Sequence, residues 1–319
     1  MQNLRMILTD KFIWLLTAAL LLAVTVPVHG AGVRIGQTIT SGGIFLIFLL
    51  HGIRLERSEV IDGIKNVRLQ GAIFGFVFGA MLLMGLLMSK LTDNFLPLDL
   101  ALGFLFLGVL PSTVQSATSY CAIANGNVAG SVVASALSNL SGVIVAPVLF
   151  AVLASAAGMT ITSDALVRIA TILLLPFVLG QLVQPWARSW VMAHKALTGW
   201  TDKIVIAIVV YISFSGATVA GTWLQIEGQQ LTILGLGIAL MLLFGFYGAW
   251  SLGGWLDLNR DDRKTLLFSG AQKSIAIGAP FAAILFPPER AGMILLPLLI
   301  YHMAQLIISA PVALHLSKD

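Results

Sequence analysis

Long apolar segments alternate with short polar connections along almost the whole chain. A helix needs about 20 apolar residues to cross the roughly 30 Å hydrocarbon core of a membrane, and most of these segments approach or exceed that length. The connections leave little chain for a soluble domain. The pattern predicts an all-α membrane protein with ten spans, at residues 12–28, 39–54, 69–88, 98–124, 128–155, 168–186, 204–223, 231–256, 264–286 and 291–315.

The fourth apolar segment becomes polar in its second half. Pro111 ends an apolar run, and mostly hydroxyl and amide side chains continue to Ser119. Because proline removes a backbone donor and clashes with the preceding turn, we expect the helix to unwind here. A packed proline kink needs fewer polar residues than this, and a polar break at membrane depth must line protein or water. The candidate site residues of this break are Pro111, Thr113, Gln115, Ser116 and Thr118.

The ninth segment is interrupted in the same way, by Gln272, Lys273 and Ser274, with Pro280 following. Lys273 is the only charged side chain that we place deep in a span, because all fourteen acidic residues fall in connections or near segment ends. It lies roughly ten residues from either end of its segment, too deep for its stem to reach the headgroups easily. A charge there costs roughly 2.5–3.5 kcal/mol on insertion scales, so Lys273 is a candidate functional residue.

Polar side chains also form stripes along the fifth and tenth segments, at spacings that place most of them on one helical face. Singly, each is typical of an interhelical hydrogen bond worth about 1 kcal/mol. Together, beside both breaks, they predict a polar pocket. The stripes consist of Ser131, Ser135, Ser138 and Asn139 in the fifth segment and of His302, Gln305 and Ser309 in the tenth.

Two further patterns indicate packing or solvation instead of chemistry. Gly71, Gly75 and Gly79 recur every four residues in the third segment, which favours close approach of a neighbouring backbone. The segment from Asp257 to Lys264 mixes acids and bases, and we interpret it as a solvated cytoplasmic loop.

Composition agrees with a membrane protein. Hydrophobic residues make up 58% of the chain, charged residues 10%, and the mean hydropathy is +0.96, values that no water-soluble domain has. The single Cys121 excludes an intramolecular disulfide framework. The apolar run after Lys11 resembles a signal peptide, but no clear cleavage site bounds it, so we interpret it as the first span.

The basic residues indicate topology. They are scattered through the connections instead of forming a patch with aromatic residues, so we expect no nucleic-acid partner. Only Arg34, Lys90, Arg168 and Arg290 fall on the side opposite the N-terminus, and this asymmetry predicts an inner (plasma) membrane protein with both termini cytoplasmic. On the N-terminal side lie Arg5, Lys11, Arg54, Arg57, Lys65, Arg68, Arg188, Lys195, Lys203, Arg260, Arg263, Lys264 and Lys318.

The ten segments divide into two halves, residues 1–160 and 161–319, of five spans each. An odd number of spans per half forces the halves into opposite orientations, which is the inverted-repeat design common among secondary transporters. In that design substrate and ion sites lie near the midplane, where corresponding helices are broken. The discontinuous fourth and ninth spans are the corresponding pair here.

Taken in order, these motifs resemble the bile acid:sodium symporter superfamily (solute carrier family 10), in its bacterial branch similar to the seventh human member. The resemblance covers nearly the whole chain. It is carried by His51-Gly52-Ile53-Arg54-Leu55, Pro111 to Ser119, Asn125-Gly126-Asn127, Gln272-Lys273-Ser274 and Pro297-Leu298-Leu299-Ile300-Tyr301-His302.

The resemblance implies a panel domain from spans 1, 2, 6 and 7, a core domain from spans 3, 4, 5, 8, 9 and 10, and alternating access by movement of one against the other. Sodium-coupled members bind the cation behind the crossing of spans 4 and 9, with a glutamate on span 9. Phe268 stands where that glutamate aligns. The oxygen ligands that the resemblance implies for sodium are Ser116, Ser131, Ser135, Asn139 and Gln272.

The missing carboxylate and the adjacent ammonium leave two mechanisms beside sodium coupling. Lys273 substitutes for sodium as a fixed cation, or it releases its proton when buried and couples transport to the proton gradient. An organic anion is the substrate that suits this electrostatics. The site residues on the second break are Gln272, Lys273, Ser274, His302 and Gln305, and we expect no cofactor except the coupling ion.

Two other functions compete with transport. The first is a channel or regulatory membrane protein that moves no organic solute, although the sequence shows no acidic ring and no selectivity-filter loop. The second is an intramembrane hydrolase using Ser116 or His302, which we do not expect because no carboxylate is placed to orient the histidine.

Overall fold

The computed structural model of the chain describes residues 11–55, 66–156 and 167–318, and the regular structure in these ranges is entirely helical. The first half contains α2 (Lys11–Thr25), α3 (Ala31–Arg54), α5 (Val67–Gly75), η1 (Phe76–Ala80), α6 (Met81–Thr92), α7 (Leu98–Val109), α8 (Gln115–Ile123) and α9 (Val128–Ala156). The second contains η2 (Ala170–Leu174), α11 (Leu175–Ala193), α12 (Lys195–Val219), η3 (Thr222–Gln225), α13 (Gly228–Leu243), η4 (Phe244–Gly248), α14 (Ala249–Trp255), α15 (Arg260–Ala271), α16 (Ile275–Leu285) and α17 (Pro288–Leu316).

Every predicted apolar segment lies on helix, but several boundaries differ from the prediction. Among the described residues, seven helices are long and apolar enough to cross a membrane, while α2 and α7 are apolar but shorter. Helix α12 begins at Lys195, nine residues before the apolar run at 204, because its first turns are amphipathic. Asp202 in these turns forms an ion pair with Arg54 at the end of α3, with 2.6 Å between nitrogen and oxygen.

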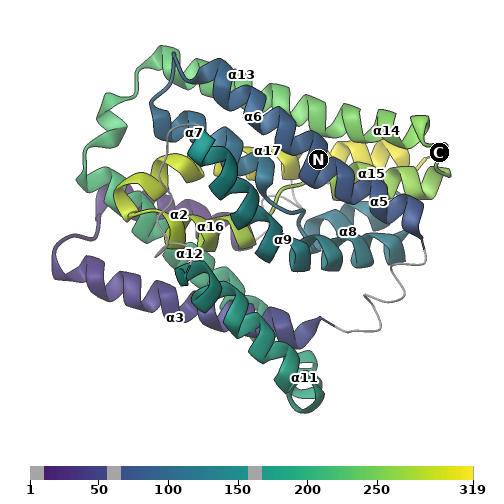
Figure 1. Cartoon of the computed structure of the whole chain (residues 1–319), viewed down its shortest axis with the longest axis horizontal. Helices are drawn as coiled ribbons and strands as arrows, with labels where there is room; N and C mark the ends of the chain where they lie inside the picture. The colour runs from purple at the N-terminus through teal and green to yellow at the C-terminus, as the bar shows by residue number, and fades with distance from the viewer. Residues whose placement is uncertain (1–10, 56–65, 157–166, 319) are drawn as a thin grey trace.

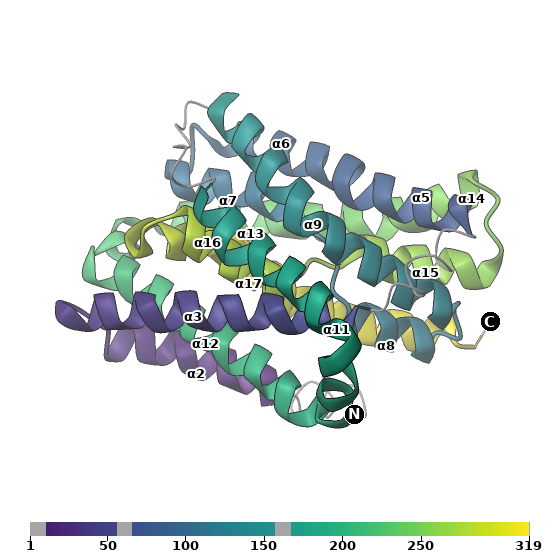
Figure 2. The same cartoon turned by 60° about the horizontal axis from the view of Figure 1, so that its bottom comes forward.

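The helices form two groups (Figures 1 and 2). Helix α3 packs along α11, and α12 packs against both α2 and α3, so these four helices form one group. The other group contains α5 to α9 and α13 to α17, with α17 packed on α7 and α6 on α7. Helix α12 also contacts α16 and α17, and it therefore joins the two groups. Most of the buried apolar side chains form one continuous core.

Paired glycines bring helices of each group into close contact. A Cβ atom added to Gly85 of α6 would lie 2.8 Å from the Cα atom of Gly108 on α7. In the other group, Gly52 of α3 and Gly180 of α11 face each other, and a Cβ on Gly180 would lie 3.0 Å from the Cα of Gly52. Neither pair can accept a larger residue without displacement of the backbone.

The glycines predicted to serve this purpose do not do so. Nothing lies within 4 Å of a Cβ added to Gly71, Gly75 or Gly79, so that prediction was wrong. The π-helical turn η1 inserts an extra residue into this helix and rotates the face that follows it. The stripe of glycines therefore does not continue onto the face of Gly85 that meets α7.

The segment from Asp257 to Lys264 is only in part the solvated loop that the sequence pattern predicted, since Asp257 and Asn259 are exposed but the segment then becomes helical and partly buried. Asn259 caps α15, which begins at Arg260, and both Asp262 and Lys264 are buried. The Asp262 carboxylate accepts hydrogen bonds from the side-chain amides of Asn66, Asn127 and Asn259, at 2.7–3.2 Å. These amides replace water around the charge and join the starts of α5, α9 and α15.

Candidate functional site

The two predicted breaks meet, but the first is shorter than predicted, because the chain is non-helical only from Leu110 to Val114 and Gln115 to Ser119 belong to α8. Helix α7 ends at Val109, and Leu110 is extended, as expected for a residue that precedes proline. Helix α15 ends at Ala271, and Gln272 to Ser274 separate it from α16. The backbone N–H of Ser274 donates to the carbonyl of Pro111 at 3.0 Å, so the two breaks pair through their main chains. Pro111 is also packed against Gly142 of α9, where a Cβ would lie 2.6 Å from the proline ring.

The Lys273 side chain is fully buried at this crossing. Its ammonium donates to the carbonyls of Leu110 at 2.7 Å, Gly108 at 2.9 Å and Val77 at 3.1 Å. Gly108 and Leu110 belong to the C-terminal end of α7, where carbonyls lack helical partners and the helix dipole is negative. Val77 belongs to the π-helical turn η1. All three ammonium protons therefore have an acceptor, and one break supplies the charge that stabilises the other.

The tenth apolar segment holds the backbone of the second break. The Gln305 side chain accepts from the N–H of Lys273 at 2.8 Å and donates to the Lys273 carbonyl at 3.1 Å. His302 Nδ1 lies 2.8 Å from the Gln305 amide nitrogen and 3.3 Å from the same carbonyl. Gln305 thus replaces both backbone hydrogen bonds that Lys273 loses at the break, and His302 Nδ1 accepts from the same amide nitrogen and holds it in place.

Gln272 connects the two breaks through side chains. Its amide oxygen accepts from the hydroxyls of Thr113 at 2.7 Å and Ser116 at 2.5 Å, and these hydroxyls are 2.6 Å apart. Its amide nitrogen donates to Ser309 of α17 at 3.1 Å. The amide oxygen thus has two donors from the first break, and the amide nitrogen joins the second break to α17.

Four of the residues implied as sodium ligands, Ser116, Gln272, Ser135 and Asn139, belong to one hydrogen-bonded network that runs through Thr113, and Ser131 lies apart from it. Ser131 is 3.2 Å from Ser269 and 3.4 Å from Thr118, while Ser135 donates to the carbonyl of Thr113 at 3.2 Å. Asn139 donates to a backbone carbonyl of its own helix. Phe268 is fully buried beside the ring of Tyr120. No group of three His, Cys, Asp or Glu side chains suited to a metal ion occurs among the described residues.

Some predicted residues remain apart from this network. Gln115 is exposed at the start of α8 and makes no side-chain contact that places it with Gln272 or Lys273. Ser274 and Pro111 are buried and contribute through their backbones. The carbonyl partners of Lys273 were not predicted, because backbone acceptors leave no mark in the pattern of side chains.

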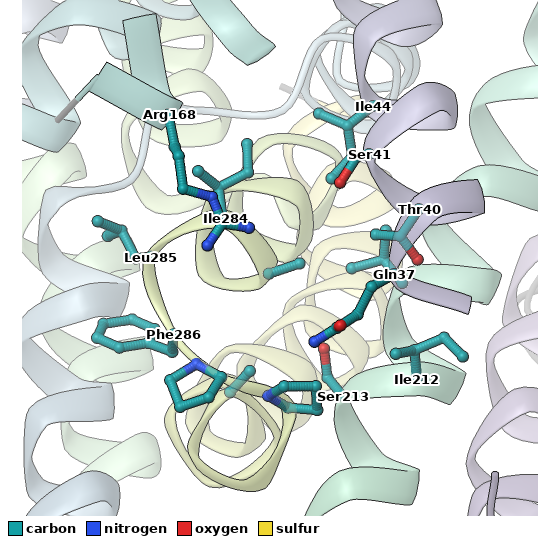
Figure 3. Close-up of a pocket in the computed structure, with 15 residues that line it drawn as sticks. Gln37, Thr40, Ser41, Ile44, Arg168, Ile212, Ser213, Ile284, Leu285 and Phe286 are labelled. Carbon is teal, nitrogen blue, oxygen red and sulfur yellow. The ribbon is translucent and has the colours of Figure 1, made fainter. Parts of the chain in front are cut away.

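A cavity of about 260 Å³ lies elsewhere, between α3, α12 and the junction of α16 and α17. Figure 3 shows Arg168 extending into it from one side and Gln37, Ser41 and Ser213 on the other. None of the predicted site residues lines it. The sequence signal was a short polar stripe, Gln37, Thr40 and Ser41, on one face of an otherwise apolar helix.

Comparison with known proteins gives a consistent result. The model of the SBF-like CPA transporter family matches residues 10–318. An uncharacterized protein of Pseudomonas aeruginosa is 35% identical over 309 residues, which cover 96% of this chain and 92% of that protein. YfeH of Escherichia coli, whose name describes a candidate symporter, is 34% identical over 304 residues, covering 95% and 92%. The sodium/bile acid cotransporter 7 of Rattus norvegicus is 23% identical over 293 residues, covering 90% and 85%.

Proposed function

This chain belongs to the SBF-like CPA transporter family, and from that premise we propose that it moves an organic anion by alternating access with Lys273 as a built-in cation. The family and the relatives establish a multi-pass membrane transporter of the bile acid:sodium symporter type. The alternating-access mechanism, the organic-anion substrate and the replacement of a coupling ion by Lys273 are our proposal. The observation that carries it is the contact of the Lys273 ammonium with three backbone carbonyls.

The proposed architecture has ten spans in two inverted halves. The pairing of η1 with η4 supports it, because a π-helical turn interrupts the third span and another the eighth, and their rings Phe76 and Phe244 stack with centroids 5.8 Å apart. The group of α2, α3, α11 and α12 would be the panel. In order, the spans are α2, α3, α5–α6, α7–α8, α9, α11, α12, α13–α14, α15–α16 and α17.

The membrane orientation follows from the charges. Thirteen basic residues fall on the side of the N-terminus and four on the other, so both termini would lie in the cytoplasm of a cell with this protein in its inner membrane. In this orientation the cavity near Arg168 lies toward the outer face, and the exposed start of α8 lies toward the inner half of the membrane.

A fixed cation fits the crossing better than a mobile proton does. An ammonium has three N–H donors, and three carbonyl oxygens surround the nitrogen of Lys273 at 2.7–3.1 Å. A neutral amine has only two N–H donors and would direct its lone pair at a carbonyl lone pair. The three carbonyl oxygens therefore match the three donors of the ammonium, and in our proposal this ammonium replaces the charge that sodium brings to related transporters.

Sodium coupling has less support. Sodium is a hard cation that prefers oxygen ligands with negative charge, and Phe268 stands where the carboxylate of sodium-coupled members aligns. The hydroxyls of Thr113 and Ser116 already donate to the Gln272 oxygen, the atom that a cation would need. A full positive charge on the adjacent Lys273 would add repulsion.

Uptake by the purified protein in liposomes tests transport itself. Radiolabelled lactate and succinate loaded outside should enter saturably, and unlabelled anion inside should accelerate entry, because an alternating-access carrier exchanges its substrate. A channel would show no such acceleration and would carry a current. The absence of saturable uptake for every tested organic anion would contradict the proposal.

A further inference from the structure

Arg168 is the one charged residue among the described residues that line the cavity between α3, α12 and the α16–α17 junction. Its guanidinium extends into the cavity, as Figure 3 shows. An arginine at the end of a membrane span ordinarily extends outward to the headgroups. Its side chain forms no hydrogen bond or ion pair with another residue in the described part of the chain. The guanidinium is therefore available to a ligand.

We propose that this cavity is a binding site for the carboxylate of a small organic acid, with Arg168 as the residue that selects for negative charge. The planar guanidinium presents paired N–H donors that match the two oxygens of a carboxylate. Gln37 and Ser41 of α3 and Ser213 of α12 line the remaining walls and offer hydrogen bonds to polar substituents. The proposal rests on the proposed function for the view that the bound anion is cargo.

The size of the cavity restricts the ligand. Its volume of about 260 Å³ is below the roughly 300–1,000 Å³ of pockets that hold drug-sized ligands. Apolar walls from Ile44, Ile212 and Phe286 leave only a small polar surface. An acid of a few carbon atoms fits these limits, whereas a steroid-sized bile acid does not.

An unsatisfied polar group lies in the same wall. The hydroxyl of Thr40 is buried and has no hydrogen-bond partner among the described residues, although Thr40 is only one turn from Gln37. Buried hydroxyls are ordinarily paired. A ligand held between Arg168 and Gln37 would bring a hydrogen-bonding group into the neighbourhood of this hydroxyl.

The dipole of helix α16 opposes the binding of an anion in the cavity, but its effect is smaller than the attraction by Arg168. The C-terminal end of α16 borders the cavity at Leu285, and the negative end of a helix dipole repels an anion. That end carries roughly half an elementary charge, against the full charge of Arg168. The same helix begins at Ile275, beside Lys273, and is about 16 Å long. It therefore connects the cavity to the crossing of the two breaks.

The local potential of the cavity can be measured with a thiol reporter. Ser41 lines the cavity, so Ser41→Cys places a thiol there. The natural Cys121 is buried and should not react with the labelling reagents. The rates of labelling by the anionic sulfonatoethyl and the cationic trimethylammonioethyl methanethiosulfonates give a ratio that reports the potential at that thiol. Arg168→Gln should lower the ratio of anionic to cationic rate on the order of tenfold. Arg34→Gln removes the same charge at the same end of the bundle without lining the cavity and should change the ratio less than about twofold.

Protection by ligands tests the carboxylate. Lactate or succinate should slow labelling of the Ser41→Cys thiol, whereas the neutral succinamide should not. Arg168→Gln should abolish this protection, and Arg168→Lys should keep part of it. Gln37→Cys provides a second reporter if Ser41→Cys does not fold. The proposal is overturned if Arg168→Gln leaves the ratio unchanged, if succinamide protects as well as succinate, or if neither acid protects. Binding that persists without uptake would refute the proposed transport and leave this site intact.

Discussion

The ammonium nitrogen of Lys273 lies 2.7 Å from the carbonyl oxygen of Leu110. The charge in the α15–α16 break therefore caps the C-terminal end of α7, the helix that precedes the other break. The pairing has a mechanical consequence. Any movement that separates the α15–α16 break from α7 leaves carbonyls without donors in a membrane interior, which is costly. We therefore expect the two breaks to move as one unit during transport.

Replacing Lys273 by methionine should destabilise the protein by at least about 3 kcal/mol, because the carbonyls of Val77, Gly108 and Leu110 lose their donor while remaining buried. Thermal unfolding in detergent measures this. Ile307→Met, at an exposed position of α17, is the control and should have little effect. An unchanged unfolding temperature for Lys273→Met would show that the ammonium contributes nothing to the crossing.

A carboxylate at position 268 should introduce sensitivity to sodium. Phe268→Glu alone places an acid in a buried apolar position and should lower stability. Combined with Lys273→Gln, it supplies the negative charge and removes the competing cation. Sodium should then raise the unfolding temperature of the double variant, since ligands that bind the native state stabilise it.

The comparison for this experiment is the same titration with choline chloride, which controls for ionic strength. The wild type should respond equally to both salts. A double variant that is equally indifferent would mean that the hydroxyls of Thr113 and Ser116 on Gln272 do not form a cation site even when a carboxylate is added one helical turn before Gln272.

Two glycine substitutions in the third span, on either side of the π-helical turn η1, should have opposite effects. Gly85→Ala places a Cβ 2.6 Å from the carbonyl of Phe104 and should cost about 1–3 kcal/mol of stability. Gly75→Ala meets nothing within 4 Å and should gain roughly 0.5–1 kcal/mol from helix propensity. Thermal unfolding of the two variants side by side measures the difference. Equal effects would contradict the contact between α6 and α7.

The sequence predicted the breaks and Lys273 because both depart sharply from an apolar background. It did not predict the partners of Lys273, since Val77 and Gly108 contribute backbone atoms and the π-helical turn that positions Val77 follows no simple periodicity. The same turn explains why the glycine stripe around Gly75 packs against nothing.

The cavity was missed for a different reason. Its polar residues come from helices far apart in the chain. In the sequence, Arg168 was only one of the four basic residues assigned to the side opposite the N-terminus. The start of α12 was missed because Asp202 and its neighbours interrupt the apolar run, although Arg54 compensates the charge. Periodicity identifies a buried face, and it does not identify which distant residues share a space.

The sodium dependence of organic-anion uptake tests the central claim most directly. Uptake of succinate into liposomes would be measured with sodium on both sides replaced by choline, for the wild type and for Lys273→Gln. The account predicts that the wild type transports equally in both salts and that Lys273→Gln loses transport in choline. Wild-type uptake that stops in choline, together with uptake in sodium that survives Lys273→Gln, would contradict it.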